Sequence, residues 1–379
     1  MRVLIADDAH TFGGAQIAAV NMARYLAETC GHDVVFACSR KNERLTEKLS
    51  QLADVTVMDR GHVAMPLNIL THLLVLWRVA FIAQRLRAIR PDVVLVNMAG
   101  FEFGWLYIYA AKLLRLRTIC WLHNPTRYDE LLPRTGWRRL ASLVRDRCAD
   151  QFAKLIAPDV FIVSHAARAY LRQRLDRPDQ FGILGNVVFA APPGAVPAPD
   201  PLAGLLAGYR ATRVAVVPGR VSFGDKGQDR LLPCLADLER RAIAIVFVGD
   251  GGDLAALKTA CAGHRNVFFA GWQQSIDAYM VHADVVLLPS RFEAQPLIAL
   301  EAMALNRPMV TSSIAPFIEL AGESYACEFS DGAALCEKIE QVCSIDKEQL
   351  MVDYQMRMAR FSGPVYRDQV ARALAGRTQ

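Results

Sequence analysis

Nine cysteines are scattered along the 379 residues of this chain, and no two of them have the C-x-x-C spacing. An odd number without that spacing indicates neither a disulfide framework nor a zinc ribbon, and it suits a reducing compartment. The amino terminus runs from Met1 straight into an apolar strand, without the basic region, apolar core and cleavage site of a signal peptide. We therefore expect a cytoplasmic location.

Three phosphate-binding signatures are missing as well. The sequence has no Asp-x-Asp pair suited to a magnesium diphosphate, and no glycine-rich loop with the Gly-Lys-Ser/Thr ending of a P-loop. The first glycine turn is not G-x-G-x-x-G, and the apolar stretch 33–38 ends in Ser39-Arg40 instead of an acidic ribose ligand. We predict no metal site and no cofactor, and a dinucleotide-dependent oxidoreductase is left as an unfavoured alternative.

The positive charge of the chain is concentrated in its first half. Residues 1–190 contain 25 Lys and Arg against 17 Asp and Glu, a net charge of +8, whereas the whole chain has a net charge of +5. A basic face attracts anionic lipid headgroups, phosphate-bearing ligands or nucleic acid. The alternative is a solvated surface that is merely rich in arginine.

Within the segment 66–90, residues 66–83 are unusually apolar. Their pattern predicts a helix that begins at Pro66 and continues to Arg87. Its uninterrupted apolar stretches are shorter than the roughly 20 residues of a membrane span, and Arg78 would lie inside the bilayer. Two alternatives are left: a helix packed in the core, and an interfacial helix that places Arg78, Arg85 and Arg87 at the headgroups of an anionic membrane.

Apolar strands alternate with helical patterns in two series. The predicted strands are 3–7, 33–38, 92–97, 118–122 and 160–163 in the first series, and 213–218, 244–248, 267–270, 284–288 and 309–312 in the second. Repeated strand-helix units imply parallel sheets covered on both faces. The proline-rich stretch 190–201 between the series predicts a stiff linker.

We therefore predict an α/β chain of two doubly wound, Rossmann-like domains with a cleft between them. The predicted boundaries are 1–188 for the first domain, 189–212 for a proline-rich linker region and 213–379 for the second domain. Residues 365–374 are predicted to form a final helix. Its packing partner is left open, with a return to the first domain as one alternative.

Two glutamates bracket the end of the predicted strand 284–288. Glu293 falls in the following loop, and Glu301 falls eight residues later inside a helix whose first position is Pro296. The carboxyl end of a parallel strand is where α/β sheets hold ligands. With helical rise from Glu293 onward the carboxylates would lie about 12 Å apart, which suits the two ends of an extended polar ligand. Two solvated glutamates are the alternative.

A glycine-rich loop follows the predicted strand 213–218. It runs from Gly219 to Gly227, carries Arg220 and Lys226, and precedes a helix predicted near Asp229. Backbone amides at a helix start together with two cations suit a diphosphate. A surface turn with unrelated cations is the alternative.

Three further positions follow other predicted strands. Gly249 opens a glycine turn that fits a plain tight turn best, although its position also suits contact with a nucleotide base. Gly13 and Gly14 precede a helix and suit a diphosphate or an acceptor hydroxyl, with a helix cap as the alternative. His123 closes the strand 118–122, so it is expected to point into a ligand crevice.

In their order and spacing these residues resemble the large family of retaining nucleotide-sugar glycosyltransferases with the GT-B fold, which includes bacterial mannosyl and glucosyl transferases of surface polysaccharides. The resemblance covers nearly the whole chain. It is carried by Gly13-Gly14-Ala15-Gln16, His123, Ser164, Asn186, Gly219-Arg220 with Lys226-Gly227, Gly271-Trp272, and Glu293-Ala294-Gln295-Pro296-Leu297 running to Glu301-Ala302-Met303-Ala304.

The resemblance assigns roles to individual residues. It implies that Arg220 and Lys226 bind the donor diphosphate and that Glu301 accepts hydrogen bonds from the ribose. Glu293 is implied to contact hydroxyls of the transferred sugar, with a covalent nucleophile as its less favoured role, and His123 to lie beside that sugar. The implied catalytic residues are His123, Arg220, Lys226 and Glu293. The implied donor-binding residues are Gly13, Gly14, Gly219, Arg220, Lys226, Gly249, Glu293, Pro296, Leu297, Ile298 and Glu301.

Four positions depart from the family pattern. Gln295-Pro296 stands where many relatives have Phe-Gly, and Asn124 stands where many have aspartate. Asn306 replaces a glycine, but asparagine tolerates the left-handed backbone of a helix cap. We expect these changes to affect the sugar preference more than the activity.

The implied function is that of a retaining, metal-independent hexosyltransferase of surface polysaccharide or lipopolysaccharide biosynthesis. The expected donor is a UDP-, GDP- or other nucleotide-diphosphate sugar, and the expected acceptor is a hydroxyl of a glycan or of a polyprenyl-diphosphate-linked sugar. The protein is expected to be peripheral at the inner face of the cell membrane, without a nucleic-acid partner. A non-catalytic partner subunit of the same fold is the alternative, although the presence of Arg220, Lys226, Glu293 and Glu301 disfavours it.

Overall fold

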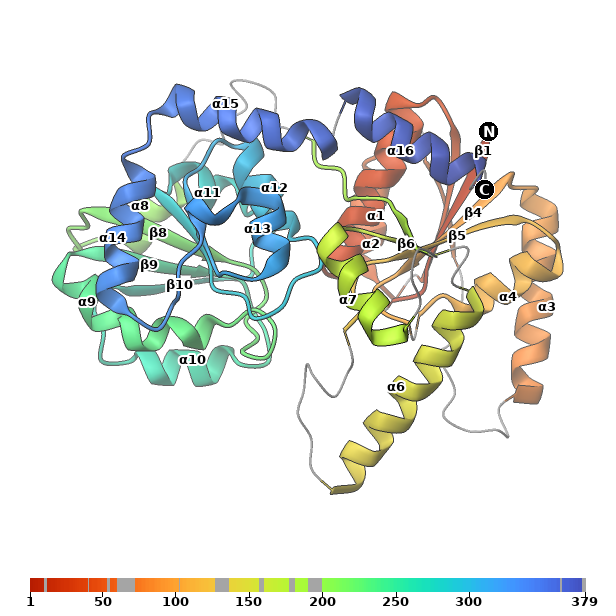
Figure 1. The fold of residues 1–379 in the computed structure, drawn as a ribbon, viewed down its shortest axis with the longest axis horizontal. Coiled ribbons are helices and arrows are strands. Elements are labelled where there is room, and N and C mark those ends of the chain that lie inside the picture. Colours follow the sequence, from red (N-terminus) through yellow and green to blue (C-terminus); the bar gives the residue numbers. More distant parts are fainter. Residues whose placement is uncertain are drawn as a thin grey trace. The chain divides into compact units, whose positions relative to one another are not determined.

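The computed structural model describes residues 1–9, 12–39, 41–52, 55–59, 72–101, 103–126, 136–156, 160–176, 181–189, 200–361 and 363–376. The chain divides into two compact units (Figure 1). Unit 1 comprises Met1–Val187 and Phe361–Gln379, and unit 2 comprises Val188–Arg360. A parallel sheet forms the centre of each unit.

Unit 1 contains a seven-stranded parallel sheet in the order β3-β2-β1-β4-β5-β6-β7. The central strands are buried along almost their whole length, as expected for a parallel sheet with helices on both faces. The strand order reverses between β1 and β4, which makes the carboxyl ends of these strands the expected place for a ligand. The strands are β1 (Arg2–Asp7), β2 (Asp33–Cys38), β3 (Val55–Asp59), β4 (Val93–Met98), β5 (Arg117–Leu122), β6 (Val160–Ile162) and β7 (Gly182–Ile183).

The last helix of the chain packs on unit 1. Tyr366 of this helix is fully buried, its hydroxyl donates to the carbonyl oxygen of Gly185 at 2.8 Å, and its ring meets Tyr25 edge-on. Arg117 also donates to the carbonyl of Ala373 at 3.0 Å. The helices of unit 1 are α1 (Gly14–Arg24, continued by a π-helical turn to Thr29), α2 (Glu43–Ser50), α3 (His72–Ile89), α4 (Trp105–Leu113), α6 (Gly136–Ile156), α7 (His165–Leu175) and α16 (Gly363–Ala375).

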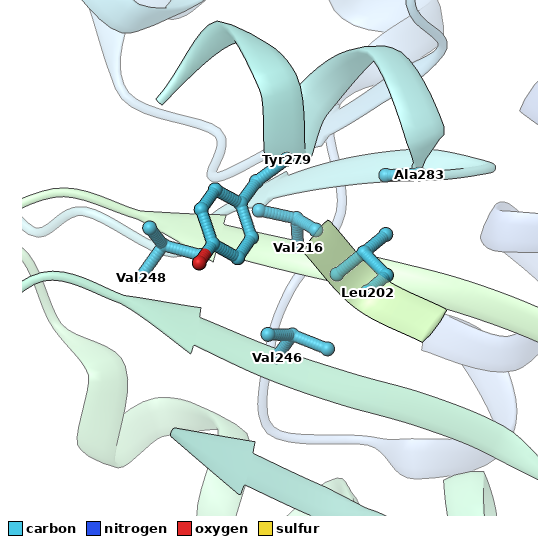
Figure 2. Close-up of a cluster of buried hydrophobic side chains, with 6 residues drawn as sticks. All are labelled: Leu202, Val216, Val246, Val248, Tyr279 and Ala283. Atoms are coloured by element: carbon cyan, nitrogen blue, oxygen red, sulfur yellow. The ribbon is translucent and has the colours of Figure 1, made fainter. Parts of the chain in front are cut away.

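Unit 2 contains a five-stranded parallel sheet in the order β10-β9-β8-β11-β12. On one face, Leu202 and Tyr279 pack against Val216, Val246 and Val248 of two adjacent strands (Figure 2). The strand order reverses between β8 and β11, so the loops after these strands flank a second switch point. The strands are β8 (Arg213–Pro218), β9 (Ile243–Val248), β10 (Val267–Gly271), β11 (Val285–Leu288) and β12 (Met309–Thr311).

The helices of unit 2 connect these strands and extend the chain to Arg360. They are α8 (Pro201–Leu205), α9 (Leu235–Arg240), α10 (Leu254–Cys261), α11 (Asp277–His282), α12 (Leu297–Ala304), α13 (Ala315–Ala321), α14 (Gly332–Cys343) and α15 (Lys347–Met358). Short 3₁₀ segments lie at Gln228–Cys234, Glu323–Tyr325 and Ala359–Phe361.

The strands predicted from the apolar runs are all present, within one or two residues of their expected ends. Two strands escaped prediction, β3 and β7, which form the edges of the unit 1 sheet. β7 is only two residues long, so it has no periodicity to detect. Residues 200–212, predicted to lie in the linker region, form part of unit 2, because Leu202 of α8 is buried in its core.

Three predicted helix starts need comment. The start at Pro66 lies outside the described residues, and α3 is described from His72. The helix predicted near Asp229 is a 3₁₀ segment with Pro233 inside it, since proline lacks the N–H that an α-helix interior requires. Pro296 is the N-cap of α12 and not its first residue, so helical rise does not describe the path from Glu293. None of the helices within the described ranges is long and apolar enough to cross a bilayer.

Candidate functional site

The loops after β8 and β11 are joined at the switch point of the unit 2 sheet. The backbone N–H groups of Arg291 and Phe292 donate to the backbone carbonyl of Asp225 at 2.9 and 3.1 Å. Gly227 permits this approach, because its φ is +65° and a Cβ there would lie 2.5 Å from the carbonyl oxygen of Pro289. Residues from two distant parts of the sequence therefore form one surface.

Lys226 and Glu293 meet at this junction. Lys226 Nζ lies 2.6 Å from Glu293 Oε1, and the hydroxyl of Ser290 donates to the same oxygen at 2.9 Å. The Glu293 side chain is 10% exposed and that of Lys226 is 29% exposed. Within the described part of the chain, Glu293 Oε2 makes no hydrogen bond, so it can accept one from a ligand hydroxyl.

Arg220 extends from the same glycine-rich loop. Its guanidinium pairs with Asp225 at 2.7 Å, but the Arg220 side chain is 66% exposed, so the pair contributes little to stability and can open. Burial by itself would raise the pKa of Asp225. A hydrogen bond with Ser222 and the nearby cations Arg220 and Lys226 outweigh burial and hold this pKa below its usual value. The loop thus presents two cations around one ionised carboxylate.

The glycine turn after β9 packs directly on the loop after β8. A Cβ on Gly249 would lie 2.0 Å from the carbonyl oxygen of Gly219, and a Cβ on Gly251 would lie 2.1 Å from that of Val221. Both positions therefore need glycine for packing, whether or not a ligand contacts them. A Cβ on Gly219 would meet no atom of the described residues within 4 Å.

The N-terminus of α12 follows the β11 loop. Pro296 is its N-cap in extended backbone, and no side chain among the described residues caps the helix. The amides of Leu297 and Ile298 therefore begin a helix whose positive end suits a phosphate. Glu301 lies inside α12, as the sequence predicts, and it is half-buried.

In unit 1, a chain of polar contacts runs along the carboxyl edge of the sheet. The N–H of Gly13 donates to Gln16 Oε1 at 3.1 Å, and Gln16 Nε2 donates to Asp7 Oδ2 at 3.0 Å. Asn97 Nδ2 lies 2.5 Å from the same Asp7 oxygen, and Asn97 Oδ1 lies 2.7 Å from His123 Nε2. These contacts connect the start of α1 with the end of β5.

His123 is held on several sides. Its backbone N–H donates to the carbonyl of Met98 at 2.9 Å, and its ring packs on Trp121 with the centroids 4.4 Å apart. Burial lowers the pKa of His123 to about 3, so its imidazole is neutral at pH 7. The neighbouring Asn124 accepts from the N–H of Thr126 at 2.8 Å and closes a local turn.

The predicted site residues therefore fall into two groups. Those in unit 1 are Gly13, Gly14 and His123; those in unit 2 are Gly219, Arg220, Lys226, Gly249, Glu293, Pro296, Leu297, Ile298 and Glu301. The structure brings Lys226 and Glu293 into direct contact, and it connects Gly13 with His123 through other residues.

Sequence reasoning missed Asp7, Asn97 and Ser290. Asp7 and Asn97 are buried polar residues near the ends of apolar strands, and this placement is the signal that could have identified them. Across the described ranges, no group of three or more His, Cys, Asp and Glu side chains is arranged to hold a metal ion.

Two protein-family profiles match this chain. Residues 12–188 match the profile described as Glycosyltransferase Family 4, and residues 212–344 match the profile described as Glycosyl transferases group 1. The two matches include every predicted site residue.

Solved structures with the GT-B fold are similar to this chain over its whole length. HepE from Anabaena, solved with UDP and glucose and also with UDP-glucose, has a TM-score of 0.73 and 19% identity, with 99% of each chain covered. WaaG, described as a glycosyltransferase involved in lipopolysaccharide biosynthesis, has a TM-score of 0.65 and 15% identity, with 100% of each chain covered. The predicted GT-B fold is therefore confirmed.

A shorter sequence similarity links the chain to a curated protein. The O-antigen biosynthesis glycosyltransferase WclY of Escherichia coli is 34% identical over 98 residues, which are 25% of this chain and 27% of WclY. The chain thus matches about a quarter of the length of that relative.

Proposed function

This chain belongs to the group 1, family 4 glycosyltransferases with the GT-B fold, and we propose that it moves a hexose from a nucleotide-diphosphate sugar to a hydroxyl of a glycan or lipid-linked sugar. The contact between Lys226 and Glu293 carries this proposal. An activated sugar has a phosphate at one end and a ring with hydroxyl groups at the other. At the switch point of a parallel sheet, a cation suits the phosphate and a carboxylate suits the hydroxyl groups.

The donor is bound by side chains and amides of unit 2. Arg220 leaves its exposed pair with Asp225 and, together with Lys226 and the first amides of α12, neutralises the diphosphate. Glu301 accepts hydrogen bonds from the ribose, and Glu293 Oε2 accepts one from the sugar. HepE is solved with UDP-glucose, which makes UDP-glucose the first donor to test.

The chemistry follows from the charges at the site. Transfer breaks the bond between the anomeric carbon and the diphosphate oxygen, and it forms a bond from that carbon to the acceptor oxygen. Negative charge grows on the leaving diphosphate, where the fixed cations Arg220 and Lys226 stabilise it most strongly. The leaving phosphate takes the proton of the acceptor hydroxyl, and the anomeric configuration is retained. The two cations serve in place of a metal ion.

The acceptor is proposed to reach unit 1 from a membrane surface. On α3, Trp77 and Phe81 are 56% and 44% exposed. The guanidinium of Arg78 lies 5.5 Å from the ring centre of Trp77, and that of Arg85 lies 5.1 Å from the ring centre of Phe81. Exposed aromatic rings with arginines beside them suit the interface of an anionic bilayer.

A second exposed apolar surface lies on α6, which extends away from the unit 1 sheet (Figure 1). Its side chains Leu140, Leu143 and Val144 are 64%, 43% and 50% exposed, and the exposed Arg139 and Arg147 lie on the same helix. Both surfaces support a peripheral position at the cytoplasmic face of the membrane, where a polyprenyl-diphosphate-linked acceptor of surface polysaccharide synthesis would be met.

A mass-spectrometric screen tests this function. The purified protein is incubated with a panel of UDP- and GDP-sugars, with and without EDTA, and release of the nucleotide diphosphate is followed. We expect turnover of one donor class that survives EDTA and is lost in Lys226→Met. Turnover that EDTA abolishes would refute metal independence alone. A folded protein that neither binds nor turns over any donor would instead support the non-catalytic alternative.

A further inference from the structure

The side-chain amide of Asn97 has one defined orientation. Its Nδ2 lies 2.5 Å from Asp7 Oδ2 and 3.2 Å from the carbonyl oxygen of Ala15. The Asp7 carboxylate also accepts from the N–H of Ala9 at 2.9 Å and from Gln16 Nε2 at 3.0 Å. Three N–H donors converge on this carboxylate, so the donor end of the Asn97 amide must face it, and Asn97 Oδ1 must face the other way.

This orientation decides which nitrogen of His123 carries the proton. Asn97 Oδ1 lies 2.7 Å from His123 Nε2, and an amide oxygen can only accept a hydrogen bond. Nε2 must therefore be the protonated nitrogen. Because burial keeps the ring neutral, Nδ1 is left with a lone pair.

The lone pair of Nδ1 makes no hydrogen bond within the residues that the structure describes. His123 is partly exposed, so this lone pair can accept a hydrogen bond from a ligand. His123 follows β5, next to β4, whose end carries Asn97.

We propose that Asn97 and Asp7 are positioning residues that hold His123 in the Nε2–H tautomer, so that Nδ1 offers a permanent hydrogen-bond acceptor at the carboxyl edge of the unit 1 sheet. Such an acceptor binds a ligand hydroxyl, and it repels an ionised phosphate oxygen, which has no proton to donate. That the hydroxyl belongs to a sugar substrate rests on the proposed function. The tautomer itself does not depend on it.

Nuclear magnetic resonance of the ligand-free, full-length protein tests the tautomer directly. The eight histidines are labelled with ¹⁵N, and His123 is assigned by the loss of its signals in His123→Gln. Long-range ¹H–¹⁵N correlations then show which ring nitrogen is protonated. We expect the neutral Nε2–H form of His123 throughout the range of about pH 6 to 8 in which ordinary histidines titrate.

A substitution at position 97 sharpens the test. Asn97→Leu removes the acceptor, and we expect it to populate the Nδ1–H form. Asn21→Leu is the matched control, because it removes another amide of the same unit, one that donates to the carbonyl of Val187 at 3.0 Å.

The wild-type spectrum decides the matter even if a variant fails to fold. An Nδ1–H tautomer or a charged imidazolium at neutral pH would overturn the proposal, and so would an unchanged tautomer in folded Asn97→Leu. Donor turnover is measured separately. A wild-type protein with the Nε2–H form but no donor turnover would uphold this inference while refuting the proposed function.

Discussion

The amine of Lys226 contacts the carboxylate of Glu293 at 2.6 Å, although the two residues are 67 positions apart in the chain. They meet because β8 and β11 are neighbours in the sheet and their following loops are hydrogen-bonded to each other. Under the proposed function, the cation would lie beside the leaving diphosphate and the carboxylate beside the transferred sugar. This arrangement is the basis of the first prediction.

Replacement of Lys226 by methionine should remove most of the activity. We expect Lys226→Met to lower kcat/KM for the donor by about 100- to 1,000-fold, the loss typical for removal of a fixed electrostatic stabiliser. Steady-state kinetics with UDP-glucose and related donors provide the measurement. Lys347→Met, which removes an exposed lysine at the start of α15, is the control and should leave kcat/KM unchanged. Equal activity of the two variants would exclude Lys226 from catalysis.

Truncation of Glu301 should weaken donor binding more than turnover. A lost hydrogen bond to a ribose costs about 1–3 kcal/mol, which corresponds to roughly a 5- to 150-fold rise in KM. We expect this rise for Glu301→Ala, with kcat reduced less, in kinetics with the preferred nucleotide sugar. Glu337→Ala on α14 removes an exposed glutamate of the same unit and serves as control. A donor KM that stays at the wild-type value would disprove the ribose role.

A methyl group at Gly249 should destabilise unit 2. The added Cβ would lie 2.0 Å from the carbonyl oxygen of Gly219, and the φ of Gly249 is +147°. We expect Gly249→Ala to lower the free energy of unfolding by about 2–4 kcal/mol in urea denaturation. Gly252→Ala, in the same loop, is the control, because its Cβ would meet no atom of the described residues within 4 Å. Similar losses for both variants would contradict the packing argument.

Burial of neutral His123 should make unit 1 sensitive to acid. The pKa of His123 is about 3 in the folded protein, against 6.5 for an unperturbed histidine. Below about pH 6.5 the unfolded chain binds a proton that the folded chain does not, so the free energy of unfolding falls as the pH falls toward 3. This one group contributes a slope of up to about 1.4 kcal/mol per pH unit.

In His123→Gln this group is lost, so we expect the free energy of unfolding to fall less steeply as the pH is lowered. Urea denaturation followed by tryptophan fluorescence at several values between about pH 4.5 and 7 measures the slope. His165→Gln removes an exposed histidine of the same unit and controls for the substitution itself. An identical slope in wild type and His123→Gln would mean that the folded protein protonates this imidazole normally.

Charges placed on α3 should release the protein from membranes. We expect the double variant Trp77→Glu, Phe81→Glu to reduce co-flotation with phosphatidylglycerol vesicles by about tenfold, because two anchoring rings are lost and the local charge becomes less positive. Wild-type binding should also weaken with added salt. Met356→Glu, at a 67% exposed position on α15, is the control. Salt-independent flotation, or none at all for the wild type, would contradict the membrane proposal.

Much of the fold is predictable because the information is local. The apolar runs around Leu4 and Val246 are buried in parallel strands. A continuous apolar run that is followed by a helical pattern is sufficient to predict such a strand. Asn306 has a φ of +52° at the end of α12, as expected for an asparagine in place of a glycine cap. The position of Glu301 inside a helix was predictable in the same way.

Only part of the candidate site could be predicted from local sequence patterns. Gly249 lies in the loop after β9, but its need for glycine comes from the carbonyl of Gly219, on a different strand-loop unit. Asp7 and Asn97 share a contact across 90 positions of sequence, and no spacing rule connects them. Such contacts depend on which strands become neighbours, and the order of strands is settled by packing of the whole sheet.

By itself, then, the amino-acid sequence determined most of the strands, the glycine-rich loops and the residue types of the candidate site, because these depend on periodicity and on backbone freedom within a few residues. Only the tertiary structure decided that Lys226 pairs with Glu293 and that Asn97 sets the tautomer of His123. Lys226 and Glu293 meet at the switch point of the unit 2 sheet, and Asn97 and His123 meet at the ends of the neighbouring strands β4 and β5, so both relationships depend on which strands lie side by side.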